Sequence, residues 1–179
     1  GSYHHIDLKK IDEAQLESGH CFVNYTKCGD LSSLTWHQDH LNVEKNVVRV
    51  QYAAMNFRDL LLALGRLERE KSGFACGIGY EFSGITIDEN GMPGKKVGGV
   101  VNGCGFSSYI HINDAILINF PDDWSLEDAA TVPISYYTVY YAFFVKTTIK
   151  SGQSILIHSG SGALGQAAIQ IAYAYGMEV

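Results

Sequence analysis

Residues 154–179, SILIHSGSGALGQAAIQIAYAYGMEV, hold the pattern that decides the fold. A short apolar run suited to a buried strand stands first, and an apolar stretch with helical spacing ends at Gly176. Between them lie glycines spaced as G-x-G-x-x-G, namely Gly160, Gly162 and Gly165. In this context the three glycines allow a tight turn, close approach of the backbone to a phosphate, and packing of helix on strand. The stretch predicts a strand over 154–158, a phosphate-binding loop, a helix, and the start of a second parallel strand at 177–179.

The earlier part of the chain has the pattern of strands and turns. Apolar and β-branched residues recur with strand-like spacing over 20–26, 46–55, 95–103 and 107–118, with a break at Asn113-Asp114. One helix interrupts this pattern: apolar residues recur with helical spacing after Asn56, which suits a helix cap, and Gly65 suits the end. We therefore expect a small mixed β domain that contains a single clear helix.

The composition changes after Phe120. Ser125 and Asp128 form a capping-box pattern that opens a short helix ended by Pro133, and a longer helix is expected over 135–148. The predicted fold class is mixed α+β followed by α/β. We place a β-rich substrate domain at 3–125 and the incomplete first part of a nucleotide-binding domain at 126–179, which suggests a longer parent enzyme.

Charge and composition exclude several functional classes. The chain has 13 basic and 19 acidic residues, a net charge of −6, and no basic block, so we expect neither a nucleic-acid nor a membrane partner. We expect neither secretion nor membrane spanning, because residues 1–179 show no apolar N-terminal stretch of the signal-peptide type and no apolar run long enough to cross a membrane. The cysteines make no C-x-x-C pair, which argues against a disulfide framework and favours a reducing, cytoplasmic location; they are Cys21, Cys28, Cys76 and Cys104.

Five stretches in order resemble the enoyl reductase domain of animal-type fatty acid synthases, which belongs to the medium-chain dehydrogenase/reductase superfamily. They are GDLSSLTW (29–36), QYAAMNFRDLLLALGRL (51–67), GYEFSG (79–84), WSLEDAATVPISYYTVYYAFF (124–144) and SGQSILIHSGSGALGQAAIQIA (151–172). Enoyl reductases of polyketide synthases are similar at nearly every stretch, and GDLSSLTW and YYTVYYAF favour the fatty acid synthase. The alternatives are a polyketide synthase enoyl reductase, a stand-alone quinone or enal reductase, and a non-catalytic remnant.

The resemblance implies a GroES-like substrate domain followed by a Rossmann domain, with the active site in the cleft between them. It implies NADPH as hydride donor to a trans-2-enoyl thioester on acyl carrier protein, and a homodimeric parent. The residue that reads the adenine ribose follows the glycine motif by about 20 residues, at or beyond Val179, so only the resemblance favours NADPH over NADH. We expect the segment by itself to be inactive.

The resemblance also implies positions for cofactor-binding residues. Asn56 matches a position beside the nicotinamide and substrate, where its amide could bond a carbonyl oxygen, although the same residue suits a helix cap. Thr138 matches a position near the nicotinamide, and its alternative is a hydroxyl bonded to its own helix. The pyrophosphate loop matches Ser159, Gly160, Ser161, Gly162, Ala163, Leu164 and Gly165.

Other polar residues are expected to be structural or stay unassigned. We interpret Arg58 and Asp59 as architectural, and Glu81 as a buried carboxylate that satisfies backbone groups. Zinc-dependent relatives have a histidine where this chain has Tyr80 and a cysteine near the NFRD stretch, so we expect no metal. No catalytic proton donor is assigned, because the donors proposed in the family would lie beyond Val179. The aromatic residues of 136–144 suit a core or interdomain face, with an acyl channel as the alternative.

Overall fold

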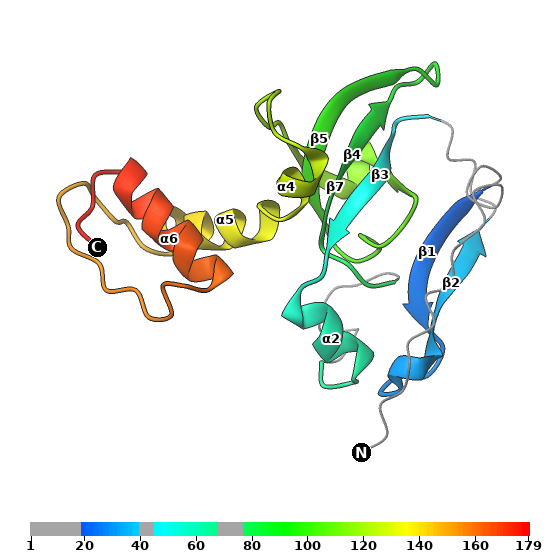
Figure 1. The fold of residues 1–179 in the computed structure, drawn as a ribbon, viewed down its shortest axis with the longest axis horizontal. Coiled ribbons are helices and arrows are strands. Elements are labelled where there is room, and N and C mark those ends of the chain that lie inside the picture. Colours follow the sequence, from blue (N-terminus) through cyan, green and yellow to red (C-terminus); the bar gives the residue numbers. More distant parts are fainter. Residues whose placement is uncertain (1–18, 40–44, 68–76) are drawn as a thin grey trace.

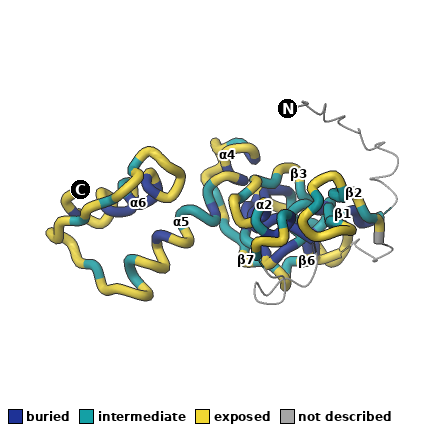
Figure 2. Tube along the Cα trace, turned by 90° about the horizontal axis from the view of Figure 1, so that it is seen from below, coloured by how far each residue is buried: buried dark blue, intermediate teal, exposed yellow. Residues whose placement is uncertain are grey.

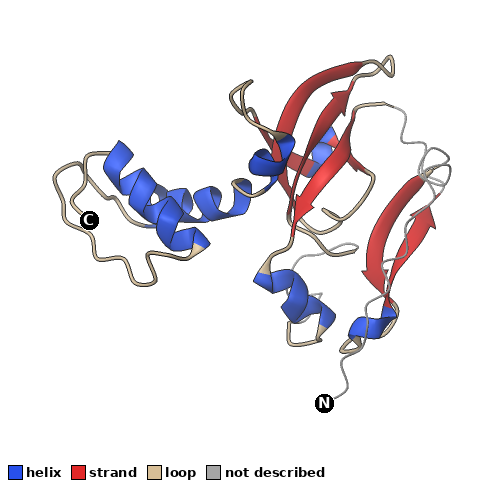
Figure 3. Cartoon of the chain, viewed as in Figure 1, coloured by secondary structure: helices blue, strands red, loops and turns tan. Residues whose placement is uncertain are grey.

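The computed structural model describes residues 19–39, 45–67 and 77–179. The strands gather in one part of the molecule and the two longest helices in another (Figures 1 and 3). We call residues 20–118 the sheet region and residues 133–179 the helical region. In Figure 1 the helical region extends to one side, and a short helix, α4 (Leu126–Ala130), lies against the sheet at the junction.

The sheet region is built on a five-stranded antiparallel sheet. Its strands run in the order β6-β3-β4-β5-β7. Their bounds are β3 (Val47–Ala54), β4 (Glu81–Ile87), β5 (Pro93–Val101), β6 (Tyr109–His111) and β7 (Ala115–Ile118). A 3₁₀ turn, η2 (Ile112–Asp114), separates β6 from β7 and confirms the predicted break at Asn113-Asp114.

A separate two-stranded hairpin lies beside this sheet. β1 (His20–Tyr25) was expected, whereas β2 (Leu34–Asp39) was not; a 3₁₀ turn, η1 (Leu31–Ser33), precedes β2. The Val23 N–H donates to the Phe106 carbonyl at 2.8 Å, and the Ser108 N–H donates to the Cys21 carbonyl at the same distance. These bonds attach the hairpin to the segment that precedes β6.

The core of the sheet region is apolar and buried (Figure 2). It consists of Val48, Phe82, Val97, Val101 and Ile110. A Cβ placed on Gly99 would lie 2.8 Å from the Phe82 ring and 2.9 Å from the Ile116 carbonyl oxygen. The glycine therefore leaves room for the Phe82 ring, which explains why no bulkier residue stands there.

The single helix predicted in the sheet region is confirmed as α2 (Phe57–Ala63). Asn56 is its N-cap, and Gly65 follows its end with a φ of +66°. A left-handed conformation of this kind favours glycine, which is why the apolar helical pattern stops there.

The short helix α4 starts as predicted, with the Ser125 hydroxyl accepting a bond from the Asp128 N–H at 3.0 Å. Pro133 opens the next helix, α5 (Pro133–Tyr140), where its missing N–H costs nothing. The expectation of one regular helix over 135–148 was wrong in its second half. There the chain widens into a π-helix, η3 (Tyr141–Lys146), after which the Thr147 N–H donates to the Ala142 carbonyl, five residues back, at 3.1 Å.

The helix after the glycine loop is confirmed as α6 (Ala163–Ala174). The predicted strand over 154–158 is reduced to an isolated parallel bridge between Ser154 and Glu178, supported by an Ile155 N–H bond to the Glu178 carbonyl at 2.8 Å. Parallel strands are stable when neighbours and helices cover them, and within the described residues the backbone of this stretch pairs only with Glu178. The division at 125/126 stays a prediction.

One expectation about the cysteines was wrong. Cys104 is disulfide-bonded, whereas Cys21 and Cys28 are free thiols and Cys76 lies outside the described residues. Spacing along the sequence gave no signal for this bond, because a disulfide depends on proximity in space. Within the described ranges, no helix has the length and apolar character needed to cross a membrane.

The fold predicts that Phe82 dominates the stability of the sheet region. Its side chain has no exposed surface, so Phe82→Ala should lower the free energy of unfolding by about 3–5 kcal/mol through lost burial and the cavity left behind. Denaturant unfolding followed by circular dichroism measures this change. The matched control is Ile116→Ala on β7, because Ile116 is 57% exposed and should contribute little. Equal losses for the two variants would contradict this packing.

Candidate functional site

The start of α2 presents a polar cluster at the end of the sheet. Asn56 and Asp59 form a capping box, in which the Asp59 carboxylate accepts from the Asn56 backbone N–H at 2.8 Å. The other Asp59 oxygen accepts from the Gly79 N–H at 2.7 Å. Asp59 is buried and ties α2 to the residues just before β4, which confirms its expected structural role.

Arg58 lies on the same turn. Its guanidinium carbon stands 4.9 Å from the centre of the Tyr80 ring, a cation–π contact. Arg58 is exposed, so the expected buried pair with Asp59 is not formed, and Arg58 contacts the residues before β4 through the Tyr80 ring.

Glu81 connects three elements through one carboxylate. It is the first residue of β4 and only 4% exposed. Its Oε1 accepts from Asn56 Nδ2 at 3.0 Å, and its Oε2 accepts from the Ile134 backbone N–H at 2.9 Å. Ile134 lies in the first turn of α5, so Glu81 joins the sheet, the cap of α2 and the start of the helical region. From the sequence we expected the Glu81 carboxylate to accept hydrogen bonds from backbone groups only, and its bond to the Asn56 side chain was not predicted.

The electrostatics of the cluster follow from this burial. Loss of solvent raises the pKa of Asp59 and of Glu81, while the hydrogen bonds that each accepts act in the opposite direction. Burial is also the main cause that raises the pKa of Tyr80 to about 12, so its phenol is neutral at physiological pH. Two buried carboxylates thus lie near one another at the start of β4, each held by donors.

Thr138 lies one helical turn beyond Ile134 on α5. A separation of four residues places it on the same side of the helix, about 6 Å along the axis. The Thr138 side chain is exposed, and no bond to its own helix is seen. The structure therefore brings Asn56 and the first turn of α5, one turn before Thr138, together through Glu81.

The predicted phosphate loop is open to solvent at the start of α6. Ser159 has a φ of +58°, and its carbonyl accepts from the Gly162 N–H at 3.0 Å, which closes the turn. A Cβ on Gly165 would lie 2.2 Å from the Ser159 oxygen, whereas one on Gly162 would make an ordinary contact at 3.4 Å. Gly165 is thus required by packing and Gly162 leaves space above the backbone.

The first turn of α6 offers hydrogen-bond donors. The first residues of a helix have N–H groups without intrahelical acceptors, and here the earliest i→i−4 bond is from the Gln166 N–H to the Gly162 carbonyl. In Figure 1 this end of α6, drawn in orange, is directed toward the sheet region. A pyrophosphate fits such an end through backbone donors and the helix dipole. No hydrogen bond among the described residues links the loop to Asn56 or Thr138.

The aromatic residues of α5 and the π-helix divide into two groups. Tyr136, Phe143 and Phe144 pack against the core between α5 and α6. Tyr137, Tyr140 and Tyr141 are between 38% and 49% exposed. A groove of about 390 Å³ is lined by Ile118, Val132, Pro133, Tyr136, Tyr137, Tyr140, Ile171 and Tyr175. The first group fits the expected core role, and the second forms an apolar surface.

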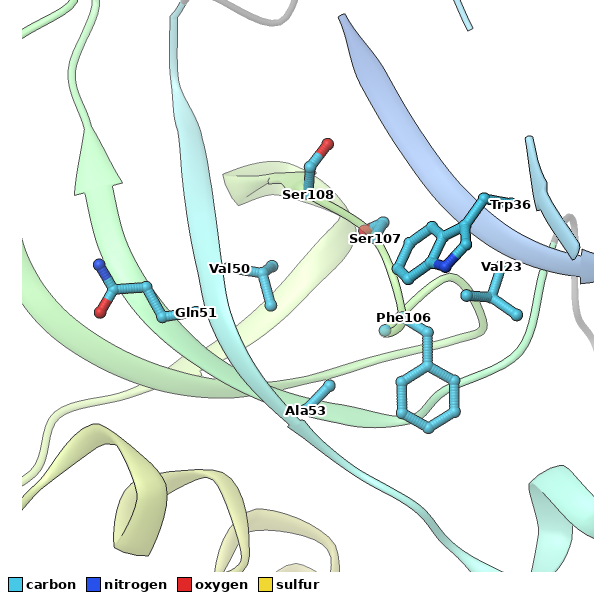
Figure 4. A pocket seen from close by; sticks show the side chains of 9 residues that line it. Val23, Trp36, Val50, Gln51, Ala53, Phe106, Ser107 and Ser108 are labelled. Atoms are coloured by element: carbon cyan, nitrogen blue, oxygen red, sulfur yellow. The ribbon is translucent and has the colours of Figure 1, made fainter. Parts of the chain in front are cut away.

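A second pocket, of about 340 Å³, lies between the hairpin and β3 (Figure 4). Trp36 and Val23 face it from the hairpin, and Val50 and Ala53 face it from β3. Sequence reasoning missed this pocket because it depends on β2, which was not predicted. Its wall is mainly apolar, with Gln51, Ser107 and Ser108 as the polar residues.

No metal centre is seen in the described part of the chain. No group of three or more His, Cys, Asp or Glu side chains there is arranged to hold an ion. Tyr80, at the position where zinc-dependent relatives have a histidine, instead has its ring under Arg58.

Comparisons place this geometry among known proteins. No family model matches the sequence. The highly reducing polyketide synthase claI of Penicillium crustosum is 31% identical over 191 residues, which cover 97% of this chain and 8% of that protein. The crystal structure of the JamJ enoyl reductase in its apo form is 31% identical, with a TM-score of 0.75, and covers 90% of this chain and 53% of that one. The chain has the fold of the medium-chain dehydrogenase/reductase enoyl reductases.

This enoyl reductase fold confirms the predicted order, a GroES-like region followed by the start of a Rossmann domain. The quinone oxidoreductase of Escherichia coli, solved with NADPH, shares the fold with a TM-score of 0.68 at 23% identity, over 88% of this chain and 50% of that one. The chain thus spans about half of these solved structures and a small part of the polyketide synthases it resembles.

The raised pKa of Glu81 predicts a pH dependence of stability. Because its folded pKa lies above the ordinary value of 4.5, its contribution to stability is fully present below pH 4.5 and is lost as the pH rises through the raised pKa. Glu81→Gln does not titrate, so its free energy of unfolding should fall less than that of the wild type over this range. Denaturant unfolding at a series of pH values measures the difference. The exposed control Glu89→Gln should follow the wild type, and a steeper fall in Glu81→Gln would contradict the assignment.

Proposed function

We propose that this chain is part of a polyketide synthase enoyl reductase, which uses NADPH to reduce trans-2-enoyl thioesters carried on acyl carrier protein to saturated acyl chains. The observation that carries the proposal is the open glycine loop at the start of α6, in a chain with the enoyl reductase fold. The parent would be a soluble, cytoplasmic, homodimeric multidomain enzyme.

The polyketide synthase interpretation has more support than the fatty acid synthase first favoured by GDLSSLTW and YYTVYYAF. The relatives found by sequence include polyketide synthases, among them claI and the erythronolide synthase EryA2. The two kinds of synthase carry the same chemistry, an enoyl thioester reduced by a nicotinamide. A stand-alone quinone reductase of the same fold is the second candidate, favoured by the likeness to the E. coli enzyme.

Several residues would hold the cofactor. The loop from Ser159 to Gly165 would bind the pyrophosphate through backbone N–H groups, and Asn56 and Thr138 would lie beside the nicotinamide. NADPH, when bound, supplies the hydride for the β-carbon of the alkene. The protein would position the reactants, exclude water and deliver a proton to the α-carbon.

The full-length protein that contains this segment should oxidise NADPH when offered a short trans-2-enoyl thioester, because the cofactor site and substrate cleft are then complete. The loss of NADPH absorbance measures the rate, and the saturated thioester is the expected product. A simple quinone and the saturated thioester serve as controls. Turnover of the quinone alone would mean a quinone reductase, and no NADPH oxidation with any acceptor would contradict the proposal.

Substitutions at two glycines of the loop should distinguish a role in packing from a role in cofactor binding. Gly165→Ala should destabilise the protein by about 1–3 kcal/mol, because the added carbon would lie 2.2 Å from the Ser159 oxygen. Gly162→Ala should leave stability nearly unchanged, since its φ is −77° and the added carbon makes an ordinary contact, while NADPH binding weakens as the pyrophosphate loses its close approach. Denaturant midpoints and NADPH fluorescence titrations measure the two effects. Unchanged NADPH affinity in Gly162→Ala would count against the loop as the phosphate site.

A further inference from the structure

The Asn56 amide nitrogen already has a partner within the protein. Nδ2 donates to Glu81 Oε1 at 3.0 Å and lies 3.5 Å from the Ala54 carbonyl oxygen, at the outer limit of a hydrogen bond. One of the two amide hydrogens is therefore committed to Glu81. The bond of this amide to a substrate carbonyl oxygen, which the resemblance suggests, stays a prediction.

Glu81 determines which end of the amide faces it. A carboxylate only accepts hydrogen bonds, so the Asn56 atom that meets it must be the nitrogen. The Asp59 backbone N–H donates to the Asn56 backbone carbonyl at 2.9 Å. The side-chain oxygen of half-buried Asn56 therefore keeps acceptor capacity for a ligand.

Glu81 is itself held firmly. Its second oxygen accepts from the Ile134 N–H at 2.9 Å, and its side chain is buried at the start of a central strand. Rotating the Asn56 amide by half a turn would place its oxygen against the carboxylate and leave a buried acceptor pair without a hydrogen. The cost of such unsatisfied buried groups keeps the amide in one orientation.

We propose that Glu81 is a positioning residue that fixes Asn56 as a hydrogen-bond acceptor, so that Asn56 recognises a donor group of the bound nicotinamide cofactor. The cofactor offers such donors in its carboxamide N–H groups and ribose hydroxyls, whereas a thioester carbonyl offers none. This inference rests on the proposed NADPH site. It adds that Asn56 accepts the hydrogen bond from the cofactor and that Glu81 determines this direction.

A pair of substitutions tests directly whether Asn56 acts as a hydrogen-bond acceptor. In Glu81→Gln the new amide has one acceptor and one donor, so it can no longer accept from both Asn56 and Ile134. In Asn56→Asp two carboxylates face one another. In the double variant Asn56→Asp with Glu81→Gln, the new amide at position 81 accepts from the Ile134 N–H through its oxygen and donates through its nitrogen to the new carboxylate at position 56. The second oxygen of that carboxylate again offers an acceptor to the ligand.

The measurement is NADPH affinity of the full-length protein by fluorescence titration, without substrate, together with kcat and KM for an enoyl thioester. Each single variant should weaken NADPH binding by about tenfold or more, as expected for a lost or reversed hydrogen bond. The double variant should return to within about threefold of the wild type. Glu89→Gln, the same change at an exposed position, should bind NADPH as the wild type does.

The outcomes separate this inference from the proposed function. If the double variant binds NADPH as poorly as the single variants although its denaturant midpoint is normal, Asn56 acts as a donor and the inference is wrong. It is also wrong if Glu81→Gln keeps full affinity, or if the wild type binds no NADPH. Loss and recovery of NADPH affinity in a protein that reduces no enoyl thioester would support the inference and refute the enoyl reductase function.

Discussion

One buried carboxylate holds the candidate site together. Glu81 accepts from Asn56 on one side and from the start of α5 on the other, at 3.0 and 2.9 Å. The sheet region and the helical region therefore share a polar contact at the point where the resemblance places the nicotinamide. Burying a carboxylate is costly, and here the cost is offset by donors that are themselves fixed by secondary structure.

The rest of the candidate site is arranged around that contact. Asp59 fixes the capping box of α2, so the backbone that carries Asn56 is rigid. The start of α5 is held by Glu81, and Thr138 follows one turn later. The glycine loop lies on the next helix, which packs on α5 through Val139 and Ile171. A cofactor that reached from the loop to Asn56 would thus contact elements whose positions depend on one another.

Much of this architecture could be predicted from the sequence. The periodicity of Leu60, Leu61 and Leu64 and the glycine after them located α2, and the glycine triplet located α6, because these signals are local. The strands β2 and β4, the π-helix and the loss of regular pairing at 154–158 depend on tertiary contacts, and the sequence analysis did not predict them. The same holds for the Asn56–Glu81 pair, whose members are 25 residues apart, and for the disulfide at Cys104.

The most direct test of the account follows the hydride itself. NADPH carrying deuterium on the transferred position of the nicotinamide would be incubated with the full-length protein and a trans-2-enoyl thioester, and the product would be analysed by mass spectrometry and NMR. We predict one deuterium at the β-carbon of a saturated thioester. A saturated product without deuterium there, or unreacted thioester while NADPH is consumed, would contradict it.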